Sequence, residues 1–164
     1  MLRHQTTELI IEYLSQIGIS SVQVDWLFRL VIAILCGAIL GMDRELRHRR
    51  IGVRTYMLVS LGSAAFTILA IEMVGAAGTG DATRAVQGIA GGIGFLGAGA
   101  IIQGDRKVGG MATAASLWAS GAIGVAAGAG YMVLAIGVAV FAAVILAISK
   151  LMDHRGSEDR PDLD

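Results

Sequence analysis

Residues 108–149 read VGGMATAASLWASGAIGVAAGAGYMVLAIGVAVFAAVILAIS, and no charged residue interrupts them. An α-helix rises about 1.5 Å per residue and the hydrocarbon core of a bilayer is about 30 Å thick, so one crossing takes about 20 residues. The stretch is long enough for two crossings, and the sequence Gly-Ala-Gly-Tyr at 128–131 supplies flexible backbone and an interfacial aromatic for a turn. The sequence therefore predicts two membrane-spanning helices, over about 111–128 and 131–150.

Three earlier windows with few charged residues are also long enough for a crossing. They predict helices over about 24–43, 56–76 and 85–103. No alternation with a period of two residues, typical of strands, competes with this interpretation. We therefore expect an all-α membrane protein in which residues 20–152 form a bundle of five transmembrane helices.

The composition of the 164-residue chain agrees with a membrane domain, because 55% of the residues are hydrophobic and 16% are charged. Soluble domains carry about 25% charged residues. The apolar content excludes a disordered chain, and the lone Cys36 excludes a disulfide scaffold. Thirteen Lys and Arg residues balance thirteen Asp and Glu residues, so nothing indicates a nucleic-acid partner.

The positions of the cations predict an orientation in the membrane. Ten of the thirteen Lys and Arg residues lie between the first and second predicted helices, between the third and fourth, or after the fifth. With five crossings, these three segments share one side of the membrane. By the positive-inside rule that side is cytoplasmic, so we expect the N-terminus outside and the C-terminus inside.

The two ends of the chain are expected to lie outside the bundle. Apolar residues between 9 and 17 recur at helical spacing, which predicts an amphipathic surface helix over 1–19. Ser20, with Gln23 three residues later, resembles a capping box that opens the first crossing. The polar residues 153–164 are expected to form a disordered cytoplasmic tail.

Glycines predict which helices approach closely, because small residues mark helix contacts in a bilayer. Gly124 lies at helical spacing with two other glycines of the fourth predicted helix, and Gly37 and Gly41 form a similar pair in the first. In the third predicted helix, over 85–103, glycines occupy opposite faces, so we expect this helix to lie between neighbours. A second interpretation stays open: a glycine-dense helix can break and expose carbonyl groups to an ion.

The segment 41–55 holds most of the charge near the first predicted crossing. If the helix continues, Asp43–Arg47 and Glu45–Arg49 are i,i+4 ion pairs, each worth about 0.2–0.5 kcal/mol. Two alternatives stay open. The two carboxylates can hold a hydrated Mg²⁺, which takes one or two carboxylates and keeps several waters, or the arginines can hold anionic lipid headgroups or a partner.

Other polar residues give weaker indications. Arg29 and Glu72, near the outer ends of the first two predicted helices, either reach the surface or pair with one another. Trp118 is expected to pack against the glycine faces, where its N–H needs a partner. The three histidines lie in termini or a loop, and no hydrolase, zinc-protease or phosphate-loop motif occurs, so an enzyme is not expected.

Four motifs together resemble the MgtC/SapB family of bacterial inner-membrane proteins. They are GMDRE at 41–45, GVRT at 52–55, GIGFLGAGAI at 92–101 and VGGMATAASLW at 108–118. The resemblance covers about residues 30–149 and implies a five-helix domain in the bacterial inner membrane. It also implies roles in growth at low Mg²⁺ and in intracellular virulence.

The resemblance further implies regulation of other membrane machines, including ATP synthase and P-type ATPases, although members are often labelled Mg²⁺ transporters. The expected partners are the lipid bilayer and another membrane protein or a second copy of the chain. Mg²⁺ is the one candidate ligand, with Asp43 and Glu45 as its contacts. The polar positions carried over are Asp43, Arg44, Glu45, Arg54, Thr55 and Thr113. The packing positions are Gly88, Gly92, Gly94, Phe95, Gly97, Gly99 and Gly124; of these, Gly94, Phe95, Gly97 and Gly99 are expected to shape the core.

Two features depart from the family pattern. Many members carry a soluble domain after the fifth helix, for which this sequence has no room before Asp164. The family often shows two adjacent threonines after the second cytoplasmic loop, where this chain has Ala112 followed by Thr113. Any function of the soluble domain is therefore not expected here.

Overall fold

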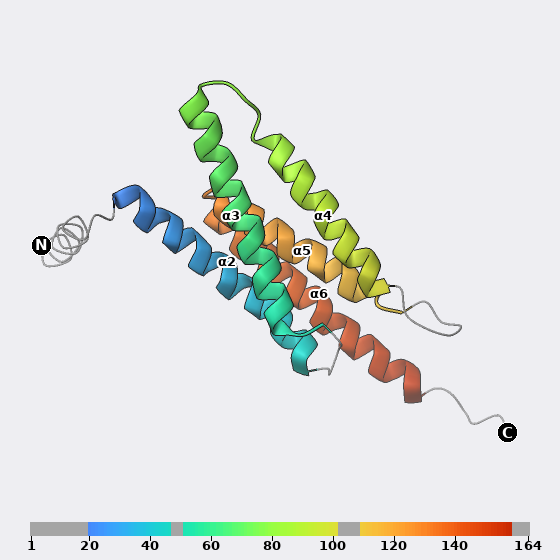
Figure 1. Ribbon diagram of the computed structural model, residues 1–164. Helices are drawn as coiled ribbons and strands as arrows, with labels where there is room; N and C mark the ends of the chain where they lie inside the picture. Colours follow the sequence, from blue (N-terminus) through green and yellow to red (C-terminus); the bar gives the residue numbers. More distant parts are fainter. Residues whose placement is uncertain (1–19, 47–50, 102–108, 159–164) are drawn as a thin grey trace, which may run out of the picture.

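The computed structural model describes residues 20–46, 51–101 and 109–158, without the side chains of 149–158. Within these residues the chain is helical and holds no strand, which confirms the all-α prediction for this part of the chain. The amphipathic helix expected over 1–19 lies outside the described residues. The five helices are α2 (Ser21–Leu46), α3 (Val53–Ala77), α4 (Thr83–Ile101), α5 (Met111–Gly128) and α6 (Met132–Glu158) (Figure 1).

The helices differ in how well they suit a bilayer. By length and composition, α2, α3 and α5 are long and apolar enough to cross a membrane, and Met132–Ile148 of α6 is a shorter apolar stretch. The helix α4 is not among these candidate spans, and Arg84 and Gln87 lie in its first turns. Three helices that can span a membrane are thus present in the described part of the chain.

Several helices extend beyond the predicted boundaries, because backbone hydrogen bonding continues into polar sequence. The capping box is confirmed at the start of α2: Ser20 N–H donates to Gln23 Oε1 at 2.9 Å, and Gln23 N–H donates to Ser20 Oγ at 3.3 Å. At the other end α6 continues to Glu158. Residues 153–158, expected to be disordered, are therefore helical.

The helix α5 lies at the centre of the bundle and packs against all four other helices. Most of its buried positions are small, and they include Gly121, Gly124 and Gly128. The helix α4 lies at the edge, where it packs along α5 and touches α3 only lightly (Figure 1). Among the described residues, the expectation that the glycine-dense helix lies between neighbours is therefore wrong. Glycine spacing marks a face that permits close approach, but it does not say which segment covers that face.

Close backbone approach explains the glycines of α2 and α5. A Cβ atom at Gly128 would lie 2.9 Å from Ala64 Cα, and one at Gly124 would lie 2.7 Å from Ser63 Cβ and collide with the Ser60 carbonyl oxygen. At Gly41 a Cβ atom would lie 2.6 Å from Val53 Cα. These contacts confirm that the glycines of α2 and α5 are packing positions.

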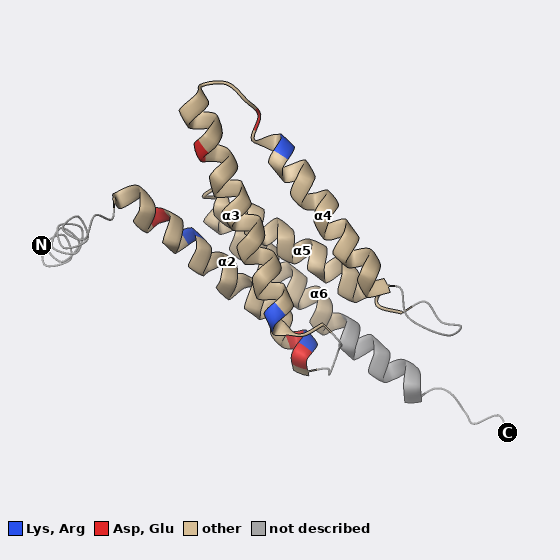
Figure 2. Ribbon diagram, in the orientation of Figure 1, with Lys and Arg blue, Asp and Glu red and all other residues tan. Residues whose placement is uncertain are grey.

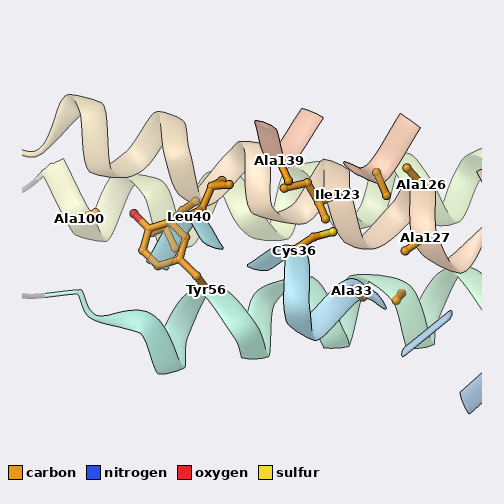
Figure 3. Packing of buried hydrophobic residues seen from close by; sticks show 12 residues of the cluster. Ala33, Cys36, Leu40, Tyr56, Ala100, Ile123, Ala126, Ala127 and Ala139 are labelled. Atoms are coloured by element: carbon orange, nitrogen blue, oxygen red, sulfur yellow. The ribbon is translucent and has the colours of Figure 1, made fainter. Parts of the chain in front are cut away.

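Buried hydroxyl groups join the three central helices. Ser60 Oγ donates to the carbonyl of Ala33 at 2.8 Å, and Ser120 Oγ donates to the carbonyl of Tyr56 at 2.9 Å. Within apolar surroundings a polar group without a partner is costly, so these bonds satisfy the hydroxyls and link α2, α3 and α5. Tyr56 is the largest fully buried side chain of the core, followed by Leu40, Leu117 and Ile123, and most of the other core residues are alanines (Figure 3).

Candidate functional site

The predicted site segment lies where α2 ends and α3 begins. The residue before α3, Gly52, offers no side chain to its free N–H groups, and Glu45 reaches across from α2 to supply the acceptor. Glu45 Oε2 accepts the Val53 N–H at 3.1 Å, and a Cβ atom at Gly52 would collide with this carboxylate. A carboxylate at a helix N-terminus also interacts favourably with the helix dipole. Glu45 is therefore an N-terminal cap for α3.

We expect Glu45→Ala to destabilise the start of α3 by about 0.5–2 kcal/mol, the usual value for removal of a helix cap. Glu45→Gln should retain most of the stability, because the amide oxygen still accepts the Val53 N–H. Hydrogen exchange of the backbone amides at 53–55, together with the thermal unfolding midpoint in detergent, measures both effects. An equal loss in the two variants would contradict the capping role.

Asp43 and Arg44 lie next to Glu45 and interact with one another. Arg44 Nε lies 3.7 Å from Asp43 Oδ2, and the Arg44 residue is 4% exposed. A buried cation requires a nearby opposite charge, and Asp43 supplies one. The partners expected from i,i+4 spacing, Arg47 and Arg49, lie outside the described residues. No group of three or more His, Cys, Asp or Glu residues that could hold a metal ion occurs in the described part of the chain.

The remaining polar positions separate into a surface group and a buried group. Arg54 is exposed and Thr55 is partly exposed in the first turn of α3. Thr113 is buried in α5, and its carbonyl accepts the Ser116 hydroxyl at 2.9 Å. The Tyr56 hydroxyl lies 2.6 Å from Ser116 Oγ and joins this group. The sequence interpretation missed Tyr56, because an aromatic at the start of an apolar window carries no periodic signal.

The α4 glycines expected at packing positions are mostly open. A Cβ atom at Gly97 would lie 3.6 Å from Ala114 Cβ, so this glycine does contact α5. Phe95 is 80% exposed and does not shape the core, contrary to expectation, because α4 has no neighbour on that side within the described chain. Nothing lies within 4 Å of a Cβ atom built at Gly88, Gly91, Gly92, Gly94 or Gly99.

The aromatic Trp118 is also placed differently from the prediction. It is 57% exposed and does not pack into a glycine face. It lies on α5 beside a crevice that α4 and α6 flank. The position of Trp118 within an apolar stretch suggested that it is buried. In a bilayer, however, a large apolar side chain is as stable facing lipid as it is inside the protein.

At the end of the bundle where α2 begins, Arg29 and Glu72 have separate partners. Arg29 forms an ion pair with Asp25 and donates from Nη1 to the carbonyl of Gly128 at 2.9 Å. A cation at the C-terminal end of α5 is favourable, because the last carbonyls of a helix carry partial negative charge. Glu72 Oε1 accepts the Trp26 Nε1–H at 3.2 Å. The structure therefore does not pair Arg29 with Glu72.

The start of α4 has its own cap in Asp81. Asp81 Oδ1 accepts the Thr83 N–H at 2.9 Å and the Thr83 hydroxyl at 2.6 Å. These two hydrogen bonds to the charged form lower the pKa of Asp81. The carboxylate therefore stays ionised over the physiological range and opens α4 at the loop that follows α3.

Comparison with known proteins shows the family to which the chain belongs. The sequence pattern that defines the MgtC family matches residues 30–155, which reach from α2 into α6. The chain belongs to the MgtC family. This membership and the apolar helices make it a multi-pass membrane protein. No solved structure matches the chain.

Three relatives illustrate the extent of the similarity within the MgtC family. Protein SrpB of Synechococcus elongatus is 42% identical over 122 residues, which cover 66% of this chain and 67% of the relative. Protein MgtC of Brucella abortus is 41% identical over 120 residues, covering 73% of this chain and 48% of the relative. The Escherichia coli protein named "Putative magnesium transporter YhiD" is 35% identical over 141 residues, which cover 80% of this chain and 63% of the relative. The matches thus span about half to two thirds of these relatives, and their names indicate no enzymatic activity.

Proposed function

We propose that this chain is an inner-membrane protein that supports adaptation to low magnesium by regulating another membrane protein through helix contacts. In this proposal all five helices cross the bilayer, the N-terminus lies outside and the C-terminus lies in the cytoplasm. The cation count supports the orientation, since ten of thirteen Lys and Arg residues lie in segments assigned to the cytoplasmic side. A role in virulence follows only from the family resemblance.

The open glycine face of α4 is the observation that carries the proposal. Gly88, Gly91, Gly92 and Gly99 lie on one face of α4, with Phe95 exposed among them, and a Cβ atom at any of the four glycines would meet nothing within 4 Å. Glycines spaced by three and four residues let a second backbone approach closely in a bilayer. A face built for close approach but left uncovered by the described part of the chain suits a helix of a partner protein.

The distribution of charge favours regulation over transport. In the described part of the chain, the acidic residues lie toward the two ends of the bundle, and its middle carries no charged side chain (Figure 2). A transporter of a divalent cation is expected to place acidic residues near the middle of the bilayer. Asp43 and Glu45 remain the candidate Mg²⁺ contacts in this proposal, as two carboxylates near one membrane edge.

Leucine substitutions on the glycine face test the proposal. In a strain that depends on this protein for growth in low Mg²⁺, we expect Gly91→Leu and Gly99→Leu to abolish growth. Gly137→Leu is the matched control, because Gly137 on α6 is another membrane glycine whose Cβ atom would meet nothing within 4 Å. The protein level and thermal unfolding midpoint should match the wild type in all three variants, since no described side chain or backbone must move.

Two outcomes would overturn the proposal. Normal growth of both α4 variants would show that the glycine face contacts no partner that matters. Saturable Mg²⁺ flux into liposomes that contain only this protein would establish transport, the function that the name of the Escherichia coli relative describes. Asp43→Asn combined with Glu45→Gln separates the metal contact: loss of growth with unchanged Mg²⁺ binding would assign these carboxylates to a partner protein.

A further inference from the structure

The helices α3 and α4 border an open apolar groove of about 680 Å³. No charged side chain is among its described lining residues. Its two hydroxyl-bearing residues are Thr55 and Ser63, and the Ser63 hydroxyl already donates to the carbonyl of Val59 at 2.8 Å. The Thr55 end of the groove is therefore its more polar end, and the rest is suited to a hydrocarbon occupant.

The length of the groove matches one leaflet of a bilayer. Its walls run from Thr55 to Phe66 on α3 and from Leu96 to Ala85 on α4. At about 1.5 Å per residue, either wall is about 16 Å long. The hydrocarbon core of a bilayer is about 30 Å thick, so one leaflet contributes about 15 Å, whereas a helix that crosses the bilayer needs the full thickness. An acyl chain fits this length better than a transmembrane helix.

Glycines in the walls leave room for such a chain. Gly62 on α3 and Gly88 and Gly92 on α4 line the groove, and a Cβ atom at any of the three would meet nothing within 4 Å. A slender, flexible hydrocarbon can therefore contact the helix backbones directly. No atom of the described residues fills the space next to these glycines.

Charge at one end of the groove indicates the class of lipid. Arg54 is exposed, directly precedes Thr55, and lies one helical turn before Leu58, which lines the groove and is 67% exposed. A guanidinium matches the geometry of a phosphate group and binds it more strongly than a neutral donor does. The opposite end lies beside Arg84, whose neighbourhood also holds the ionised Asp81 that caps α4.

We propose that the α3–α4 groove binds one anionic phospholipid, with an acyl chain along the glycines and the headgroup phosphate at Arg54 and Thr55. This site adjoins the proposed partner contact and shares Gly88 and Gly92 with it, whereas Gly91 and Gly99 of the glycine face do not line the groove. The lipid belongs to the leaflet at the Arg54 end of the bundle.

Native mass spectrometry of the full chain tests the lipid preference. The protein is purified in mild detergent and mixed with equal amounts of phosphatidylglycerol and phosphatidylcholine. We expect the wild type to retain one phosphatidylglycerol per chain. Arg54→Gln should lower its retention about tenfold, the effect of losing one charge-assisted hydrogen bond. Arg84→Gln, the matched control at the other end, should retain it as the wild type does.

Filling the groove tests its location. Gly62→Leu should abolish retention of both lipids, while Gly137→Leu should leave it unchanged. Photolabelling uses the wild-type protein, so its result does not depend on the folding of a variant. Phosphatidylglycerol with a photoreactive acyl chain should label residues of the groove such as Leu58, Phe66 and Leu96, and not Phe141 on α6.

Several results would overturn the proposal. Equal retention of the two lipids would show that the groove does not prefer an anionic headgroup. Loss of retention in Arg84→Gln but not in Arg54→Gln would show that the headgroup phosphate binds at the Arg84 end of the groove. Equal labelling of α6 would show only a general lipid coat. Cross-links from the groove to another protein chain, with no lipid retained, would make it a protein contact. None of these results depends on growth in low Mg²⁺, so failure here and failure of the regulatory proposal are distinguishable.

Discussion

Gly124→Ala is expected to destabilise the bundle by about 1–3 kcal/mol, the usual cost of overpacking a filled interior. A Cβ atom at this position would collide with the carbonyl oxygen of Ser60 and lie 2.7 Å from Ser63 Cβ. Neither α3 nor α5 can give way easily, because the bond from Ser120 to the Tyr56 carbonyl holds them together. Gly124→Leu should prevent assembly altogether.

Thermal unfolding in detergent measures this effect, with Gly137→Ala as the control. Because a Cβ atom at Gly137 would meet nothing within 4 Å, the control should unfold at the wild-type temperature. Equal midpoints for Gly124→Ala and Gly137→Ala would show that α5 does not approach the α3 backbone as closely as described.

Tyr56→Ala should cost about 3–5 kcal/mol, as large aromatic truncations in a core do. Tyr56 is fully buried, and its ring fills the space between α2, α3 and α5 where most other core residues are alanines (Figure 3). Because most of the core residues are alanines, few side chains can extend to fill the resulting cavity, so the loss should lie toward the upper end of that range.

Tyr56→Phe separates the ring from the hydroxyl. It should cost only about 1 kcal/mol, the net value of one hydrogen bond, because Ser116 Oγ still donates to the carbonyl of Thr113 at 2.9 Å. Chemical unfolding in mixed micelles measures both variants. A Phe variant as unstable as the Ala variant would show that the hydrogen bond, and not the volume of the ring, holds the site together.

Local spacing made the interior of the fold predictable. The glycines of α2 and α5 predicted contact faces, and the structure places them against the backbone of α3 because no other residue fits there. The capping box at Ser20 and the turn after Gly128 were also predicted, since each depends on neighbouring residues alone. These features need only the helical repeat and the size of side chains.

Features that depend on distant contacts were not predictable in the same way. Glycine spacing in α4 indicated a contact face but not that the face stays open, because a sequence pattern does not name the partner. The cap from Glu45 to Val53 was missed, since i,i+4 spacing suggested an arginine as its partner. Similarly, Arg29 and Glu72 lie at the same end of the bundle, yet Asp25, Gly128 and Trp26 supply their partners.

The hydrogen bond from Arg29 to Gly128 has a consequence for biogenesis, because it joins residues 99 positions apart in the chain. During synthesis α2 is made first, and at that stage Arg29 has only the local ion pair with Asp25. The carbonyl of Gly128 becomes available only after α5 has been translated and inserted. The N-terminal end of α2 therefore matures late. A nascent chain that stalls before residue 128 leaves the Arg29 guanidinium without this acceptor, and such an exposed charge is a feature by which quality control can distinguish an unfinished protein from a finished one.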